Sequence, residues 1–139
     1  MPQTLTDAQK SVIEGKNFAH VATYFPNGTV QVNPVWVNVE GDRVLINSAE
    51  GRAKVKNLRA NPNITLEINN HDNPYEYVEI RGKVIEMTHD GADDHIDALA
   101  KKYMGVDSYP LRKEGEVRVK IVIEPEKVLG NATASGGGD

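Results

Sequence analysis

The chain has 139 residues and a formal net charge of −4, from 16 basic and 20 acidic residues. This length is typical of one domain that folds without a metal or disulfide, and the absence of cysteine excludes disulfide frameworks and thiolate sites. The acidic balance argues against nucleic acid or an anionic membrane as a partner. Apolar runs are short and the N-terminus lacks the features of a secretory signal, so we expect a soluble, cytoplasmic protein.

The N-terminal part of the chain predicts a short helix followed by a strand. Thr6 and Gln9 have the spacing of a capping box, and Gly15 is a suitable terminator, so residues 6–14 are expected to be helical. Residues 18–25 then alternate as a strand, which an Asn-Gly turn closes.

Two longer segments are predicted to be bent strands. In residues 29–39 the apolar side chains occupy even positions first and odd positions afterwards, and Asn33-Pro34 lies at the change. Residues 77–88 show the same change across Gly82. Because side chains alternate between the two faces of a strand, the change requires a bulge or a break. A small closed or half-closed barrel requires strands of this kind.

The rest of the pattern completes an antiparallel barrel with peripheral helices. Further strands are expected over residues 43–47, 64–68 and 117–123, and further helices over residues 51–60 and 91–104. The sum is a mainly β fold, a six-stranded antiparallel barrel with three helices, whose strand edges a two-fold partner could cover. We place one domain over residues 1–130 and a disordered, glycine-rich tail over residues 131–139.

Basic residues gather in one short segment. Arg52, Lys54, Lys56 and Arg59 lie within eight residues that contain no acid, whereas the rest of the chain carries 12 basic and 20 acidic residues. On a helix, Arg52, Lys56 and Arg59 share one face, and Lys54 lies about 160° away from Arg52 and Lys56. The cluster suits a small anionic ligand, and the alternative is a solvated helix face.

The start of this helix is predicted to hold an anion. Arg52 and Lys54 fall in the first turn, where each cation opposes the helix dipole at a cost of about 0.3–1 kcal/mol. An anion among the free N–H groups would reverse that cost, and the hydroxyl of Ser48 could donate to it. The segment lacks the glycine spacing of a P-loop, so the prediction is a phosphate cradle of another kind.

The same segment resembles a known family. Gly51-Arg52-Ala53-Lys54 is followed by Asn57-Leu58 and Asn61-Pro62, which is similar to the signature of the split β-barrel flavin and deazaflavin oxidoreductases. That superfamily includes pyridoxamine 5′-phosphate oxidase. The resemblance covers residues 5–130, including Asn33-Pro34-Val35-Trp36, and is strongest to the short branch that uses the deazaflavin coenzyme F420.

The resemblance implies a split β-barrel that forms a homodimer with two cofactor sites at the subunit interface. It implies an oxidoreductase that transfers hydride from reduced coenzyme F420 to a small conjugated organic substrate. Arg52 and Lys54 would bind the cofactor phosphate. Residues near Asn33, Pro34, Val35, Trp36, Asn47 and Ser48 would line the ring, with Lys56 and Asn57 as further candidates. The cofactor supplies the reactive atom in such enzymes, and no catalytic residue is assigned.

Other functions stay open at this stage. The same fold holding FMN would present a phosphate to the same cradle, and a non-catalytic protein that sequesters coenzyme F420 would share the motif. The longer C-terminal segment of pyridoxamine phosphate oxidases, rich in Arg and His, is not found here, so that activity is not expected. Nucleic-acid binding is not expected either, because aromatic residues do not interleave with the basic cluster.

The remaining candidate residues are mostly given structural roles. No metal site is expected, because no ligand spacing links the four histidines, and the aspartates near residue 93 are expected to stabilise a helix start. Trp36 is assigned either to packing or to the wall of the ring pocket, and Tyr103 to the core. Tyr109 is a candidate for the pocket, and Arg81 and Arg118 are candidates for the anion site.

Overall fold

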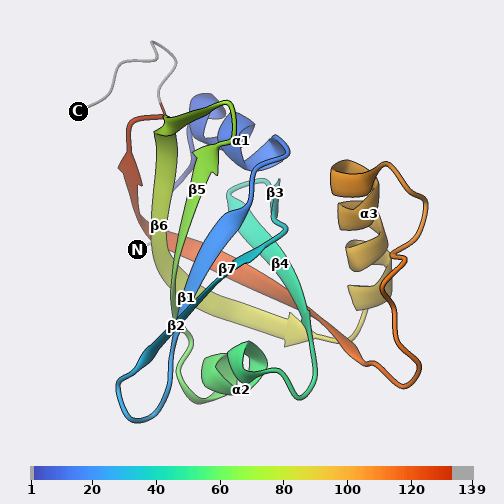
Figure 1. Cartoon of the computed structure of the whole chain (residues 1–139). Helices are drawn as coiled ribbons and strands as arrows, with labels where there is room; N and C mark the ends of the chain where they lie inside the picture. Colours follow the sequence, from blue (N-terminus) through green and yellow to red (C-terminus); the bar gives the residue numbers. More distant parts are fainter. Residues whose placement is uncertain (1, 133–139) are drawn as a thin grey trace.

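The computed structural model describes residues 2–132 (Figure 1). Its elements follow in the order α1 (Asp7–Glu14), β1 (Ala19–Tyr24), β2 (Val30–Val35), β3 (Asn38–Glu40), β4 (Arg43–Ala49), α2 (Ala53–Ala60), β5 (Asn63–Asn70), β6 (Asn73–Thr88), α3 (Ala92–Met104) and β7 (Arg118–Gly130). The strands form one sheet in the order β2-β1-β5-β6-β7-β4-β3, and every pairing is antiparallel. The predicted mainly β, antiparallel fold with three helices is confirmed.

The sheet curls into a split barrel, in which the two edge strands are not hydrogen-bonded to each other. The edge strands are β2 and β3, yet only Trp36 and Val37 connect them along the chain. Two connecting residues reach no further than about 10 Å, so the two edges must lie close together. Apolar side chains fill the interior, with Ile46, Leu66 and Ile121 among those fully buried.

The helices lie around this barrel. Helix α1 packs against β3, β5 and β6, helix α2 against β1 and β4, and helix α3 against β4 and β7. In Figure 1, α1 and α2 lie at opposite ends of the barrel and α3 lies outside the sheet. Within residues 2–132, no helix combines the length and the apolar character needed to cross a membrane.

The sheet has seven strands where the sequence predicted six, because residues 29–39 form two strands. Strand β2 continues through Asn33 and Pro34, with Pro34 opposite His20 on β1, and the break comes at Trp36 and Val37. Proline lacks the N–H that a central strand needs, but β2 is an edge strand and tolerates this. The expected break at Asn33-Pro34 is therefore wrong in position.

The predicted bend in β6 is confirmed at Gly82. The register between β6 and β7 shifts between Arg81 and Gly82 and again between Val84 and Glu86. A Cβ atom at position 82 would overlap the carbonyl oxygen of Glu124 on β7. Glycine is required here because the two backbones approach too closely for any side chain.

The boundaries of α1, α2 and the C-terminal tail can also be compared with the prediction. The predicted capping box at α1 is confirmed by hydrogen bonds in both directions between Thr6 and Gln9. Helix α2 begins at Ala53, two residues later than expected, because Gly51 has a positive φ and Arg52 is extended. Asn131, which the sequence placed in the tail, bonds to the backbone of β6, whereas residues 133–139 of that tail lie outside the described residues.

Strands β4 and β7 are largely buried on both faces, so the face that does not line the barrel interior can carry buried residues of the site. Val44 and Ile46 point into the barrel, whereas Leu45 and Asn47 are buried on the opposite face, against α3. Arg118 on β7 pairs in register with Ala49 and shares this α3-facing side with Asn47. Polar side chains are thus held in a partly closed layer between the sheet and α3.

Candidate functional site

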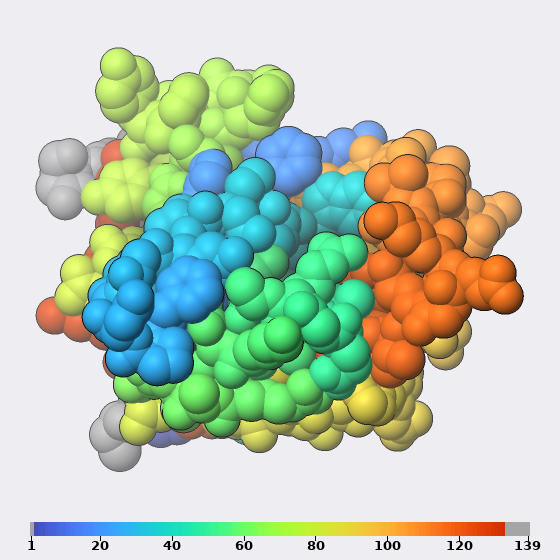
Figure 2. Space-filling view, turned by 60° about the horizontal axis from the view of Figure 1, so that its bottom comes forward, coloured from blue at the N-terminus to red at the C-terminus, as the bar shows by residue number. Residues whose placement is uncertain are grey.

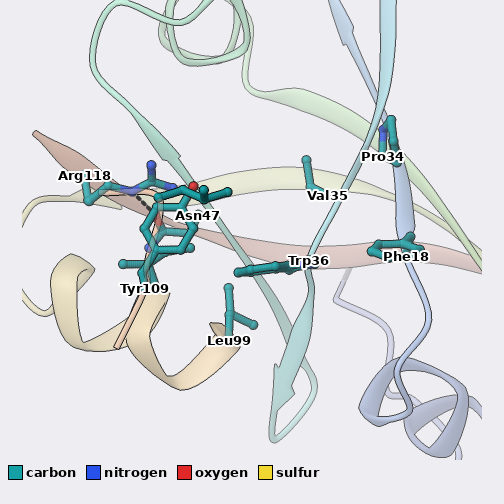
Figure 3. Close-up of a pocket in the computed structure, with 10 residues that line it drawn as sticks. Phe18, Pro34, Val35, Trp36, Asn47, Leu99, Tyr109 and Arg118 are labelled. Carbon is teal, nitrogen blue, oxygen red and sulfur yellow. Dashed lines mark hydrogen bonds between the residues drawn. The ribbon is translucent and has the colours of Figure 1, made fainter. Parts of the chain in front are cut away.

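A pocket of about 290 Å³ opens beside the link between β2 and β3 (Figure 3). Its walls come from the residue before β1, from the end of β2 and the link that follows it, from β4, β7 and α3, and from the loop after α3. The lining residues are Phe18, Pro34, Val35, Trp36, Asn47, Ile96, Leu99, Tyr109, Leu111 and Arg118. Most of these side chains are apolar or aromatic. Asn47 and Arg118 lie together at one end and Phe18 and Pro34 at the other, with Trp36 between them. The pocket therefore has an apolar body and a polar end.

Aromatic rings form one wall of the pocket. The ring of Trp36 stacks on that of Tyr103, with centroids 5.3 Å apart and planes 6° apart, and Tyr109 meets Trp36 edge-on at 5.9 Å. The Tyr103 hydroxyl donates a hydrogen bond of 2.6 Å to the carbonyl of Asn17, and burial raises the pKa of Tyr103 to about 12. Trp36 thus both packs and lines the pocket, and its flat face suits a planar ring.

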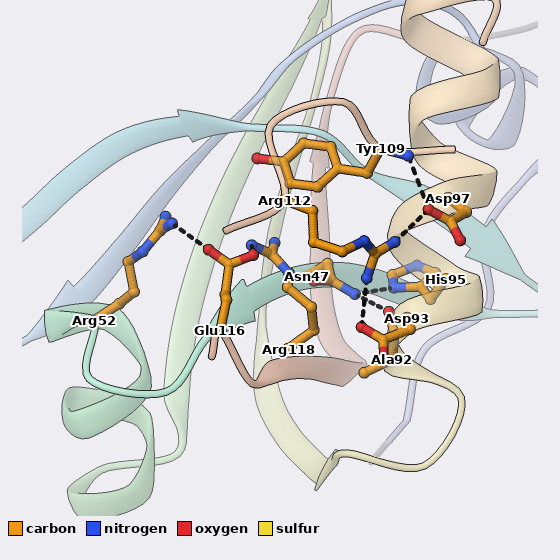
Figure 4. A network of polar contacts seen from close by, with 10 residues as sticks. All are labelled: Asn47, Arg52, Ala92, Asp93, His95, Asp97, Tyr109, Arg112, Glu116 and Arg118. Carbon is orange, nitrogen blue, oxygen red and sulfur yellow. Dashed lines mark hydrogen bonds and ion pairs between the residues drawn. The ribbon is translucent and has the colours of Figure 1, made fainter. Parts of the chain in front are cut away.

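The loop that supplies Tyr109 is fastened to α3 (Figure 4). Arg112 donates to Asp93 over 2.8 Å and to Asp97 over 2.6 Å, and Asp97 also accepts from the backbone N–H of Tyr109 at 2.8 Å. The guanidinium of Arg118 lies 5.2 Å from the Tyr109 ring centroid. Two of the aspartates that the sequence assigned to the helix start therefore also fix one wall of the pocket.

Asn47 organises the polar end through three buried contacts. Its Nδ2 donates to the carbonyl of Ala92 and to His95 Nδ1, both at 3.0 Å, and its Oδ1 accepts from Arg118 Nε at 2.9 Å. His95 then donates through Nε2 to Asn38 Oδ1 at 2.7 Å. Burial lowers the pKa of His95 to about 4, so the ring is neutral at pH 7 and accepts at Nδ1. This network holds the Arg118 guanidinium in place through its Nε.

Three cationic residues, Arg52, Lys54 and Arg118, lie near one another, and the carboxylate of Glu116 lies between the two arginines. Glu116 accepts from Arg118 Nη1 at 3.0 Å and lies 3.6 Å from Arg52 Nη2. Lys54, on the first turn of α2, is only 6% exposed, and within residues 2–132 its ammonium has no hydrogen-bond or ion-pair partner. Burial, followed by the charges of Arg52 and Arg118, lowers the pKa of Lys54 to about 8. At pH 7 this lysine is a largely charged, buried and unpartnered group.

This arrangement fits a phosphate-bearing ligand. A buried charge without a partner is costly, so a position of this kind favours a bound counter-ion. Helix α2 has no acidic residue in its first turn and no side chain that caps its N–H groups, so the N–H donors in the turn that carries Lys54 are available to an anion. Figure 2 looks onto this end of the molecule, where α2 lies between the β1–β2 hairpin and the loop after α3. An anion bound here would have its attached group beside the aromatic pocket.

Comparison with known protein families agrees with this geometry. The model of the family described as pyridoxamine 5′-phosphate oxidase matches residues 5–132. The chain belongs to this family. Among solved structures, a protein titled F420 reductase superposes with a TM-score of 0.78 at 29% identity, over 90% of this chain and 98% of that chain. A comparison with curated proteins gives no match.

More distant structures share the fold of the pyridoxamine 5′-phosphate oxidase family. HupZ of Group A Streptococcus matches with a TM-score of 0.67 at 19% identity, over 94% of this chain and 96% of that chain. General Stress Protein 26 of Bacillus anthracis matches with a TM-score of 0.64 at 17% identity, over 88% and 89%. At such identities these similarities concern the fold, and the function must be argued from the site.

Six of the residues that the sequence selected come together in the structure. Pro34, Val35, Trp36 and Asn47 line the pocket, and Arg52 and Lys54 lie outside its lining, near Arg118. Arg118 connects the two groups of residues, because it lines the pocket and its charge lowers the pKa of Lys54. The candidate role of Arg118 in the anion site is therefore supported by its position. Arg81 is exposed and pairs with Glu79 at 2.8 Å.

The other selected residues lie elsewhere. Ser48 is buried, and it alternates with Asn47 so that it faces the barrel interior. Asn57 donates to Thr23 on β1 at 3.2 Å, and Lys56 is exposed. Both residues line a separate cleft with Gly51 and Ala53. Asn33 has a buried Oδ1 without a hydrogen-bond partner in residues 2–132. A role for these four residues in cofactor binding stays a prediction.

Sequence reasoning missed several residues of the site. It treated Ile96 and Leu99 only as a buried helix stripe, and it did not select Phe18 or Leu111, which line the pocket. It also missed Glu116, the carboxylate between the two arginines. One signal was present, because Glu116 and Arg118 are two residues apart where the chain enters β7, and side chains two residues apart in an extended chain point to the same side.

Proposed function

We propose that the protein is an oxidoreductase that uses reduced coenzyme F420 to transfer hydride to a small conjugated organic substrate. The observation that carries this proposal is Lys54, a buried residue that makes no hydrogen bond or ion pair in residues 2–132 and lies near Arg52 and Arg118, of which Arg118 lines the polar end of an aromatic pocket. The 29% identity to an F420 reductase over 90% of the chain supports the deazaflavin as cofactor.

Each part of the site has a defined task under this proposal. Arg52, Lys54 and Arg118 bind the cofactor phosphate through charge-assisted contacts. Trp36 packs against the ring, because its face is held in place by Tyr103. The bound deazaflavin supplies the hydride. The protein binds, orients and keeps water away, and none of its described side chains needs to act as a nucleophile.

We further propose a homodimer with the cofactor at the subunit interface. Strand β2 has no neighbour on its outer edge in residues 2–132, and it exposes Val30 and Val32 to 45% and 61%. An edge with exposed apolar side chains favours pairing with another chain. Analytical ultracentrifugation of the full chain tests this. A sedimentation coefficient of a monomer at micromolar concentration would contradict the proposal.

A titration of tryptophan fluorescence tests the cofactor. Trp36 is the only tryptophan of the chain and lines the pocket, so a ligand there quenches its emission. We expect coenzyme F420 to bind, and the substitution Lys54→Met to weaken binding about 10- to 100-fold, the loss of one charge-assisted contact. Lys101→Met is the matched control, because Lys101 is exposed on α3 and is not among the residues predicted to bind the cofactor. Equal binding by the two variants contradicts the assigned site.

The same titration separates the remaining alternatives. Tighter binding of FMN than of coenzyme F420, together with a flavin spectrum in the purified protein, would favour the FMN-dependent function. Reduced coenzyme F420 that binds but is not reoxidised by any of a panel of quinone, enone and nitroaromatic acceptors would favour sequestration.

A further inference from the structure

One acidic side chain lies inside the cationic end of the site. The carboxylate of Glu116 bridges two arginines, at 3.0 Å from Arg118 Nη1 and 3.6 Å from Arg52 Nη2 (Figure 4). Its side chain is only 9% exposed, so solvent screens its charge weakly. Glu116 thus contributes a fixed negative charge where the proposed function requires an anion to bind.

The backbone holds Glu116 in this position. Strand β7 pairs with β4 so that Arg118 lies opposite Ala49, and the N–H of Glu50 donates to the carbonyl of Val117 at 2.9 Å. This pairing places Glu116 against the turn that begins α2. Its partner Arg118 is fixed in turn by Asn47 Oδ1.

The contacts of Glu116 occupy hydrogen-bond donors of Arg118 and Arg52 that a ligand would otherwise use. Arg118 already donates through Nε and Nη1, and Arg52 already has a carboxylate partner. Lys54 is the one cation of the three without a partner in the described residues. A phosphate that contacts Lys54 and Arg52 must therefore lie beside a carboxylate. Its repulsion is proportional to the charge of the phosphate, so a dianion is repelled about twice as strongly as a monoanion.

We propose that Glu116 is a specificity-determining residue that biases the site towards a phosphodiester, which carries one negative charge, over a phosphomonoester, which carries two. This inference rests on the proposed function. Glu116 would reduce the electrostatic advantage that the cations give to FMN, whose phosphate is a monoester, over coenzyme F420, whose phosphate is a diester. Arg52, Lys54 and Arg118 attract a dianion more strongly than a monoanion, and Glu116 offsets part of that difference.

The test compares two ligands that differ by one methyl group on the phosphate, which removes one negative charge. We would titrate the full chain at pH 8 with FMN and with the monomethyl ester of its phosphate, following Trp36 fluorescence. A phosphomonoester is a dianion at this pH, because its second pKa is about 6. Glu116→Gln should improve the affinity for FMN relative to the methyl ester about tenfold, the effect of removing one nearby charge. Glu114→Gln, an exposed acid of the same loop, should leave the ratio unchanged.

Further variants keep the outcome decisive. Glu116→Ser is a second neutral variant in case Glu116→Gln does not fold, and Glu116→Asp retains the charge and should keep the wild-type ratio. An unchanged ratio in a folded neutral variant overturns the role of Glu116. If Lys54→Met binds both ligands as well as the wild type does, the phosphate site itself is wrong, which overturns the proposed function together with this inference.

Discussion

Replacing Lys54 by methionine should stabilise the ligand-free protein while it removes the proposed cofactor contact. Lys54 is 6% exposed and makes no hydrogen bond or ion pair in residues 2–132, and its pKa falls from 10.5 to about 8. Each unit of pKa corresponds to about 1.4 kcal/mol, so the charged form costs roughly 3 kcal/mol in the folded state at pH 7. Methionine has a similar length and no charge, so it fills the same space without that cost.

The stabilisation should depend on pH in a defined window. Between pH 8 and 10.5 the unfolded chain keeps a proton at Lys54 that the folded chain has released. The stability of the wild type therefore rises with pH relative to that of the variant in this window. We expect Lys54→Met to be more stable by about 2–3 kcal/mol at pH 7, with the difference falling above pH 8 and almost lost near pH 10.5.

Urea unfolding at pH 7, 9 and 10.5 measures this difference directly. Lys56→Met is the control, because Lys56 is exposed and should change the free energy of unfolding by less than about 0.5 kcal/mol. A Lys54→Met variant that is less stable than the wild type at pH 7, or a difference that does not vary with pH, would refute the reasoning. The ammonium would then be adequately solvated or paired in the folded state.

Three further changes test how the site is supported. Gly82→Ala should destabilise the protein by about 2–3 kcal/mol in urea unfolding, because its Cβ would overlap the Glu124 carbonyl, and a loss below about 0.5 kcal/mol would contradict the close approach. His95 has a pKa lowered from 6.5 to about 4, so the wild type should lose up to roughly 3 kcal/mol as the pH falls through this window. His95→Gln should show a flatter pH dependence there, and an equal slope would contradict a buried neutral ring. Thr6→Ala should cost about 1 kcal/mol through loss of the capping box, and an unchanged urea midpoint would show that the cap contributes nothing.

Much of the fold follows from local rules that the sequence carries. The reciprocal bonds of Thr6 and Gln9 depend only on their spacing, and the bend at Gly82 is visible as a change in the parity of apolar residues. Helical geometry separates Lys54 from Lys56, and the structure buries the first and exposes the second. These features involve residues that are close in sequence, so periodicity is enough to find them.

The remaining features depend on which strands become neighbours. Pro34 is tolerated within β2 only because that strand lies at an edge, which moves the break to Trp36. Asn47 is buried because α3, some 45 residues later in the chain, covers the outer face of β4. Glu116 reaches Arg52 through the pairing of β4 with β7. Contacts at such separations are not specified by any local pattern.

A crystal structure of the full chain with coenzyme F420 tests the central claim most directly. The expected result is a phosphate oxygen within hydrogen-bonding distance of Lys54 Nζ, with the deazaflavin ring against Trp36. A phosphate bound elsewhere, with the Lys54 ammonium still unpartnered, would contradict the assignment of this site.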